Sequence, residues 1–377
     1  QKHLYRALLW SRLASGAWLT VAEGGAPNPN ALFDRARRVP WGRFCGRGDP
    51  LAIRCVSSGR GGQGVTQAES VVRRAVEVTL AAAGLPPPPA APWAPPPDAA
   101  PPDAAPPQRL LVRLDGDHLT LRLDAAGVLL HKRGWRRADG PAPLRPTLAC
   151  ACLAALDWRP GEPLLDPMCG AGTFLIEAAR AALALPPRVA GRALSCARWE
   201  GFDEALWAET RAEGRPWPWG AGGAAGGLAC DLAARSLALT REHLDAALCD
   251  VEGAPLPEAL RAPWRVAEEP RDALEALPAL LAPLATWAPS ADAGEAGGVV
   301  VVNPPYNIRV RGAAPGGGDA ARGLLRALGA HLPRGWRAGV LLPSDYPFTP
   351  PAALSCAPAL RFSHGGIPVT LWRFARA

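Results

Sequence analysis

Short apolar runs alternate with longer stretches of helical spacing from residue 148 to the C-terminus. The clearest run, Val299–Val302, consists of four valines and predicts a strand buried on both faces of a parallel sheet. Four further short runs predict strands at 163–165, 228–230, 265–267 and 339–342. Residues 360–363 and 369–374 predict a closing antiparallel hairpin. Strands that alternate with helices in this way favour a doubly wound α/β sheet.

The first 147 residues follow a different pattern. Residues 51–56 predict a strand, 69–83 an amphipathic helix and 110–123 a β-hairpin with a short polar turn. Between the helix and the hairpin, 12 of the 22 residues in 86–107 are proline. Proline on this scale predicts a disordered or polyproline insertion, because it cannot donate to a sheet ladder.

Residues 303–306, Asn-Pro-Pro-Tyr, directly follow the valine run. In open α/β sheets, ligands bind at the carboxyl ends of the strands. The side-chain oxygen of Asn303 and the carbonyl of Pro304 can accept hydrogen bonds from the exocyclic amine of a base, and Tyr306 can stack on its ring. Pro304 and Pro305 make the segment rigid. The pattern predicts a site for an amine-bearing base, and the alternative is a plain Pro-Pro turn with a packed tyrosine.

A second candidate site lies at 164–174, Leu-Leu-Asp-Pro-Met-Cys-Gly-Ala-Gly-Thr-Phe. A short strand would end at Asp166, and a glycine-rich turn and an alanine-rich helix would follow. Gly170 and Gly172 allow the backbone to approach a ligand closely. The turn is neither a dinucleotide fingerprint nor a P-loop. A carboxylate at Asp166 also disfavours a phosphate ligand, whereas the ammonium and sulfonium of S-adenosylmethionine fit its charge.

The two motifs together carry a resemblance to a known family. The segments 166–179 and 303–306 resemble those of class I S-adenosylmethionine-dependent RNA methyltransferases that carry a THUMP domain. The closest similarity is to the bacterial 23S rRNA guanine-N2 methyltransferases, in particular the N-terminal half of their fused, bifunctional form. Further similar segments are 5–14, 121–135, 142–145 and 201–207. The resemblance implies methyl transfer from S-adenosylmethionine to a guanine of 23S rRNA, before the ribosomal subunit is fully assembled.

The resemblance also implies roles for individual residues. The expected cofactor-binding residues are Asp166, Met168, Gly170, Gly172, Thr173, Asp231 and Asp272. The expected catalytic residues are Asn303, Pro304, Pro305 and Tyr306. Asp231 follows the second strand, where a carboxylate can accept the ribose hydroxyls; its alternative role is a helix N-cap. Asp272 would contact the adenine amine.

The domain organisation that the resemblance implies has four parts. Residues 1–24 would be the remnant of a ferredoxin-like subdomain, 25–135 a THUMP RNA-binding domain, 136–147 a linker and 148–377 a class I methyltransferase domain. The Gly-, Trp- and Pro-rich connection 186–225 would be a lid or a family-specific insertion. Because the only methionine is Met168, we expect an N-terminally incomplete fragment, and the second methyltransferase of the fused form is not in it.

Charge is distributed unevenly along the chain. Residues 1–147 hold 20 basic and 11 acidic residues, a net charge of +9, whereas 148–377 hold 21 and 23, a net charge of −2. This asymmetry favours a first part that binds a polyanion and a second part that carries the chemistry. The candidate RNA-binding residues are Arg73, Arg74, Lys132, Arg133, Arg136 and Arg137.

The nine cysteines lack metal-binding spacing, so we interpret them as buried thiols and expect no metal. Reduced thiols, no secretory signal and no apolar run of membrane-spanning length together predict a cytoplasmic protein without a membrane partner.

Three departures from the family pattern leave alternatives open. Leu232 stands where a second aspartate is common, Glu242-His-Leu where Asn-Ala is common, and Asn307 where glycine is usual. The alternatives are a tRNA guanine-N2 methyltransferase, an adenine-N6 methyltransferase acting on DNA, and a non-catalytic RNA-binding protein with a degenerate cofactor site.

Overall fold

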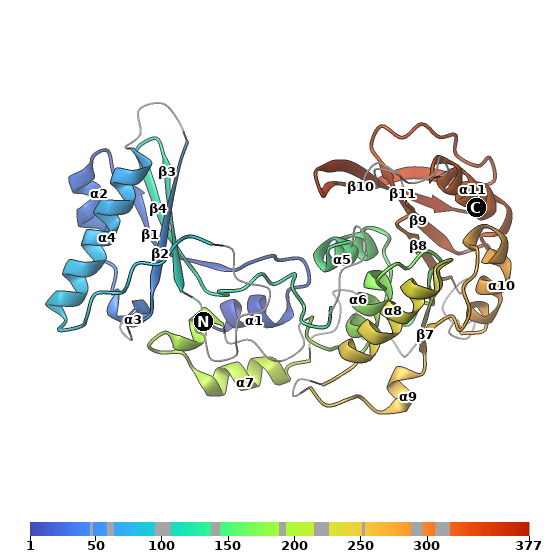
Figure 1. Ribbon diagram of the computed structural model, residues 1–377, viewed down its shortest axis with the longest axis horizontal. Coiled ribbons are helices and arrows are strands. Elements are labelled where there is room, and N and C mark those ends of the chain that lie inside the picture. The colour runs from blue at the N-terminus through green and yellow to red at the C-terminus, as the bar shows by residue number, and fades with distance from the viewer. Residues whose placement is uncertain are drawn as a thin grey trace. The chain divides into compact units, whose positions relative to one another are not determined.

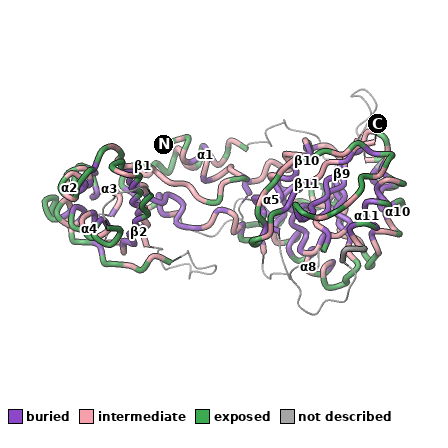
Figure 2. Tube along the Cα trace, turned by 90° about the horizontal axis from the view of Figure 1, so that it is seen from above, coloured by how far each residue is buried: buried purple, intermediate pink, exposed green. Residues whose placement is uncertain are grey.

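The computed structural model describes residues 1–45, 48–58, 64–94, 107–136, 144–187, 194–214, 226–250, 253–287, 297–305 and 317–376. The chain forms two compact units. Unit 1 comprises Gln1–Leu9, Ala14–Lys132 and Gly191–Ala212, and unit 2 comprises Trp10–Leu13, Arg133–Ala190 and Glu213–Ala377. Each unit has buried residues of its own along its strands and helices (Figure 2).

Unit 1 is built on a four-stranded sheet of order β1-β4-β3-β2. Its strands are β1 (Trp18–Gly25), β2 (Leu51–Ser58), β3 (Gln108–Asp115) and β4 (His118–Asp124). Its helices are α1 (Lys2–Trp10), α2 (Pro29–Ala36), α3 (Gly42–Cys45), α4 (Val65–Ala82) and α7 (Glu204–Ala212). Helices α2 and α4 lie together against one face of the sheet (Figure 1). The predicted hairpin and the predicted strand and helix before it are confirmed, with longer elements than the sequence indicated.

One predicted boundary in this part of the chain is wrong. Strand β1 pairs along its whole length with β4, from Trp18 opposite Asp124 to Gly25 opposite His118. Residues 1–24 are therefore not a separate subdomain, because β1 completes the same sheet as 108–124. Within the connection 186–225, residues 194–212 belong to unit 1, and its predicted role as a lid or a family-specific insertion stays a prediction.

The first part of the proline-rich run has a defined path in unit 1. The N–H of Leu51 donates to the carbonyl of Pro89 at 2.8 Å, and the N–H of Ala91 donates to the carbonyl of Leu51 at 3.1 Å. The ring of Trp93 stacks on Trp18 at 6.3 Å between ring centroids. Residues 89–91 thus bond to the first residue of β2, so the disordered alternative is wrong for 86–94, whereas 95–106 lie outside the described residues.

Unit 2 is built on a seven-stranded sheet of order β10-β11-β9-β8-β5-β6-β7. Its strands are β5 (Leu164–Asp166), β6 (Gly227–Ala229), β7 (Trp264–Val266), β8 (Val299–Val302), β9 (Arg337–Pro343), β10 (Ser355–His364) and β11 (Ile367–Ala375). Strands β7, β6, β5, β8 and β9 are parallel, and β11 and β10 add an antiparallel edge. This is the predicted doubly wound sheet with its closing hairpin, and the strand ends differ from prediction by a few residues.

Helices cover both faces of this sheet. The helices of unit 2 are α5 (Pro146–Ala155), α6 (Thr173–Ala182), α8 (Ala234–Ala247), α9 (Glu258–Arg261), α10 (Ala273–Ala285) and α11 (Gly317–His331). Val299 and Val301 belong to the core that includes residues of α5, α6 and α8, and Val300 and Val302 to the core that includes residues of α10 and α11. The alternation of strand side chains between two faces explains why all four valines are buried.

Unit 2 begins earlier than the predicted methyltransferase boundary at residue 148. Arg133 already belongs to it, and α5 begins at Pro146 within the predicted linker 136–147. In the part of the chain that the structure describes, no helix is both long enough and apolar enough to span a bilayer.

Candidate functional site

Three predicted site residues lie at the carboxyl ends of adjacent parallel strands. Asp166 pairs with Ala229 of β6, and Asp231 follows Ala229 by two residues, just beyond the end of β6. Leu165 pairs with Val300 of β8, so Asn303 lies three residues beyond that pair. Neighbouring strands are about 4.8 Å apart. The strand order reverses between β5 and β8, and this switch point is where open α/β sheets bind their ligands.

Asp166 is the last residue of β5, and its side chain is buried. Its Oδ1 atom has no hydrogen-bond partner among the described residues. Burial raises the pKa of the Asp166 carboxyl well above its ordinary value, and the nearby Asp231 raises it further, while the N–H of Met168 acts in the opposite direction. A buried carboxylate in this state favours a cationic or hydrogen-bond-donating ligand.

The turn after Asp166 uses its two glycines differently. Gly170 and Gly172 both have left-handed backbones, with φ of 54° and 74°. A Cβ at Gly172 would lie 2.5 Å from Cγ2 of Thr240 on α8, so this glycine permits close packing. A Cβ at Gly170 would meet no atom within 4 Å, so the turn is open on that side. Thr173 then begins α6.

Asp231 ties the end of β6 to this turn. Its Oδ2 accepts a hydrogen bond from the N–H of Gly170 at 2.9 Å, and its Oδ1 accepts one from the N–H of Ala233 at 2.9 Å. Each carboxylate oxygen has a second lone pair that can accept from a ligand hydroxyl. The side chain therefore has a structural role next to its predicted role in ribose binding.

The remaining predicted residues lie further from the turn or outside the described chain. Asp272 is the N-cap of α10 and accepts from the N–H of Leu274 at 2.9 Å, so the structure explains it as a helix cap. After β8, Asn303 is half-buried, Pro304 is buried and Pro305 is exposed. Tyr306 lies outside the described residues, so its predicted stacking on a base stays a prediction.

Comparison with known proteins identifies the class of unit 2. Residues 133–221 match the family model described as "RMKL-like, methyltransferase domain", and this range includes the Asp166 turn. Among solved structures, the SMU.472 protein complexed with SAH superposes with a TM-score of 0.68 at 19% identity over 100% of this chain and 88% of that chain. TrmN from Thermus thermophilus superposes with a TM-score of 0.62 at 21% identity over 97% of this chain and 84% of that chain. Unit 2 thus has the fold of class I methyltransferases.

Curated relatives are similar over more of the chain. The ribosomal RNA large subunit methyltransferase K/L of Methylococcus capsulatus is 31% identical over 346 residues, which cover 89% of this chain and 41% of the relative. The protein of the same name from Chromohalobacter salexigens is 37% identical over 214 residues, 55% of this chain and 28% of the relative. The chain thus spans less than half the length of these relatives.

The residues of the methyltransferase domain fit S-adenosylmethionine, the cofactor of this class. The buried Asp166 Oδ1, which has no partner in the part of the chain that the structure describes, suits the ammonium group of the cofactor. The open side of Gly170 leaves room for a ligand beside the turn, and Asp231 retains lone pairs for hydroxyls. Cys169 lies in the same turn, and burial raises the pKa of its thiol well above the usual value, which disfavours the thiolate form that a nucleophile needs.

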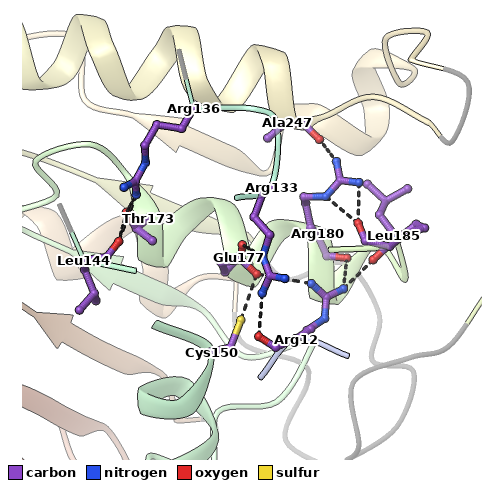
Figure 3. A network of polar contacts seen from close by, with 11 residues as sticks. Arg12, Arg133, Arg136, Leu144, Cys150, Thr173, Glu177, Arg180, Leu185 and Ala247 are labelled. Carbon is purple, nitrogen blue, oxygen red and sulfur yellow. Dashed lines mark hydrogen bonds and ion pairs between the residues drawn. The ribbon is translucent and has the colours of Figure 1, made fainter. Parts of the chain in front are cut away.

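The predicted RNA-binding residue Arg133 is buried in the methyltransferase domain (Figure 3). Its Nε lies 3.1 Å from Oε1 of Glu177, and it also donates to the carbonyl of Arg12 at 2.7 Å. Glu177 is buried too, and its Oε2 lies 3.7 Å from Arg12 and accepts from the thiol of Cys150 at 3.0 Å. This prediction is wrong, because an arginine held on all sides by protein cannot reach an RNA phosphate.

The other predicted RNA-binding residues differ in their surroundings. Arg136 donates to Oγ1 of Thr173 at 2.8 Å and to the carbonyl of Leu144 at 3.1 Å, so it supports the start of α6 (Figure 3). Arg73 donates to the carbonyl of Leu51, whereas Arg74 is exposed on α4. Lys132 is half-exposed, and Arg137 lies outside the described residues.

Two residues at the site were missed by sequence reasoning. Thr240 and His243 of α8 contact the carbonyls of Gly170 and Ala171. For His243 the only sequence signal was that the segment 242–244, Glu-His-Leu, differs from the pattern expected of the resembling family. Nothing in the sequence pointed to Thr240, because a threonine on an amphipathic helix has no recognisable function.

Proposed function

We propose that the chain transfers a methyl group from S-adenosylmethionine to the exocyclic N2 amine of a guanine in 23S rRNA. The observation that carries the proposal is the position of Asn303 at the end of β8, next to Asp166 at the switch point of the sheet. The names of the curated relatives, which are ribosomal RNA large subunit methyltransferases, support the substrate.

The proposed chemistry at this edge is direct methyl transfer, in which the site accelerates the reaction by holding the two reacting groups close together and aligned. When bound, S-adenosylmethionine would supply an electrophilic methyl group: its S–CH3 bond breaks with the electron pair left on sulfur, which gives S-adenosylhomocysteine, and the methylated amine loses one proton to water. The Asn303 side-chain oxygen and the Pro304 carbonyl accept hydrogen bonds from the guanine amine, which favours a pyramidal nitrogen with its lone pair out of the ring plane. Pro304 and Pro305 cannot donate hydrogen bonds from the backbone, and their rigidity holds both acceptors in place. Tyr306 stacks on the flipped-out base.

In this proposal, unit 1 is the RNA-binding THUMP module. Its strong positive charge supports that role, since residues 1–147 carry a net charge of +9. The exposed Arg74 and the half-exposed Lys132 are suited to phosphate contacts, whereas the buried Arg133 is not. Binding occurs on ribosomal RNA before the subunit is fully assembled, because a base can be flipped out more readily from RNA that is not yet packed by proteins.

Asn303→Ala tests the catalytic assignment. We expect turnover with methyl-labelled cofactor and 23S rRNA to fall at least about 100-fold, because one of two positioned acceptors is lost at the reacting amine. Asn30→Ala on the exposed surface of α2 is the matched control and should leave turnover unchanged. Wild-type turnover by Asn303→Ala would contradict the role of Asn303.

The same assay distinguishes the alternatives for the substrate. Wild-type protein is offered 23S rRNA, tRNA and duplex DNA, and the methylated nucleotides are located by mass spectrometry. N2-methylguanine in rRNA supports the proposal. Methylguanine in tRNA would instead identify tRNA as the substrate, and N6-methyladenine in DNA would identify duplex DNA as the substrate. Calorimetry that detects no binding of S-adenosylmethionine favours a non-catalytic RNA-binding protein.

A further inference from the structure

Helix α8 contacts the cofactor turn through two consecutive carbonyls. The hydroxyl of Thr240 donates to the carbonyl of Gly170 at 3.0 Å, and Nδ1 of His243 lies 3.1 Å from the carbonyl of Ala171. Because a carbonyl only accepts, Nδ1 of His243 carries the proton in this contact. Thr240 and His243 are both fully buried, three residues apart on the same face of α8.

The surroundings of both side chains leave them little freedom. Cγ2 of Thr240 packs in the space that a Cβ at Gly172 would occupy, at 2.5 Å. The hydroxyl of Thr240 also lies 3.5 Å from the thiol of Cys169. The ring of His243 contacts Trp135 edge to face, with 5.5 Å between centroids. Packing of this density holds the two donors in one position.

These contacts determine the direction of the turn's backbone. In a planar trans peptide, the carbonyl and the following N–H point in opposite directions. A Gly170 carbonyl held toward α8 therefore directs the N–H of Ala171 away from α8. The neighbouring N–H groups are already used, since Gly170 donates to Asp231 and Gly172 donates to the carbonyl of Cys169 at 2.8 Å. The N–H of Ala171 is therefore the hydrogen-bond donor of the turn that points away from α8, toward the side where the cofactor would bind.

We infer that Thr240 and His243 are positioning residues for S-adenosylmethionine: they hold the peptides of the Gly170–Gly172 turn in the orientation that binds the cofactor. The inference rests on the proposed function, because it concerns the cofactor of the same site. It also explains the departure from Asn-Ala in this chain. An asparagine amide nitrogen is bonded to Cγ, as Nδ1 of histidine is, so either side chain can donate to the Ala171 carbonyl.

Matched pairs of variants test this inference. Thr240→Val removes the hydroxyl and keeps the shape that packs on Gly172, whereas Thr240→Ser keeps the hydroxyl. His243→Leu removes the donor, whereas His243→Asn keeps one at the same position. Dissociation constants are measured by calorimetry with S-adenosylmethionine and with S-adenosylhomocysteine, and KM is measured for the cofactor and for RNA.

We expect the dissociation constants of both ligands to rise about tenfold in Thr240→Val and in His243→Leu, the effect of one lost hydrogen bond. Thr240→Ser and His243→Asn should stay within about twofold of wild type. The KM for the cofactor should rise and the KM for RNA should not, and a general loss of folding would change both.

Two results overturn the inference. Cofactor binding within twofold of wild type in both Thr240→Val and His243→Leu shows that the turn holds its orientation without α8. Equal weakening in His243→Leu and His243→Asn shows that packing and not the donor matters. If the wild-type protein binds neither S-adenosylmethionine nor S-adenosylhomocysteine, the proposed function itself is overturned. Results from the variants alone bear only on the inference about Thr240 and His243.

Discussion

At the scale of single residues, the balance of charge at the sheet edge is the feature with the clearest consequences. Asp166 is buried and its Oδ1 lacks a partner among the described residues, while Asp231 adds a second negative charge nearby. Both effects raise the pKa of Asp166. Burying this carboxylate without a counter-charge therefore destabilises the ligand-free domain, and a bound cationic ligand offsets that destabilisation.

Asp166→Asn should remove a pH dependence of stability. The pKa of Asp166 is higher in the folded than in the unfolded protein, so the folded state binds more protons between the two values. Its contribution to the free energy of unfolding is present below the unfolded pKa, about 4, and is lost as the pH rises through the folded pKa. The asparagine variant does not lose stability in this way as the pH rises. Near pH 7 the free energy of unfolding of its ligand-free form should be about 1 kcal/mol higher than that of wild type.

Urea unfolding of ligand-free protein between pH 4 and 8 measures this difference. The variant should also bind S-adenosylmethionine at least about tenfold more weakly, because it lacks the anion that faces the ammonium. Asp34→Asn, an exposed change on α2, is the control for the loss of one negative charge. Identical pH slopes in wild type and Asp166→Asn would contradict the assignment.

At the residue scale, the predicted positions at strand ends are confirmed, whereas the roles of these residues stay predictions. Asp166, Asp231 and Asn303 each follow an apolar run, so a parallel sheet brings them to one edge. Arg133 shows the opposite case. Its neighbours Lys132 and Arg136 made it resemble part of a basic surface, but its partner Glu177 lies 44 residues away in sequence, and only folding brings the two together.

At the scale of elements, the Gly170–Gly172 turn joins β5, α6 and α8. Gly172 is required by the side chain of Thr240, while Gly170 borders open space. The sequence showed two equivalent glycines, and the tertiary packing of α8 makes them different. Gly172 is thus fixed by packing against α8, while Gly170 leaves the turn open on one side.

Alanine substitutions should separate these two roles. Both glycines have positive φ, so an alanine costs roughly 1 kcal/mol at either position. Gly172→Ala also places Cβ 2.5 Å from Thr240 and should lower the free energy of unfolding by a further 1–3 kcal/mol or so. Gly170→Ala should lower it less but weaken binding of S-adenosylmethionine more, because its Cβ points into the ligand side.

Urea unfolding and calorimetry on the two variants check this contrast. If Gly170→Ala and Gly172→Ala lower the free energy of unfolding by the same amount and weaken cofactor binding by the same factor, the two glycines are equivalent and the contrast is contradicted.

At the scale of the whole molecule, the chain crosses between its two units more than once. Residues 194–212 return to unit 1 after α6 of unit 2, and residues 10–13, at the end of α1 and directly after it, belong to unit 2. Within unit 1, Trp199 packs against Phe44 at 5.1 Å between centroids, and its Nε1 donates to the side chain of Gln108 at 2.7 Å. The returning segment is therefore part of the core of unit 1.

Trp199→Ala should destabilise unit 1 and not unit 2. Removing a buried tryptophan costs about 3–5 kcal/mol, and Trp199→Phe, which keeps most of the packing, should cost much less. Hydrogen exchange read by mass spectrometry should show faster exchange of the β3 amides and unchanged exchange of the β9 amides. Loss of protection in β9 with β3 intact would show that 194–212 supports the other unit.

The sequence by itself determined the class of the catalytic fold, the strand ends that carry Asp166, Asp231 and Asn303, and the likeness to S-adenosylmethionine-dependent methyltransferases. These follow from local patterns, because an apolar run and a glycine-rich turn have the same meaning wherever they occur. Only the tertiary structure decided that Arg133 is buried, that β1 completes the sheet of unit 1, that 194–212 returns to it, and that Thr240 and His243 contact the Gly170–Gly172 turn. Each of these depends on contacts between residues far apart in the chain, and no local pattern encodes such contacts.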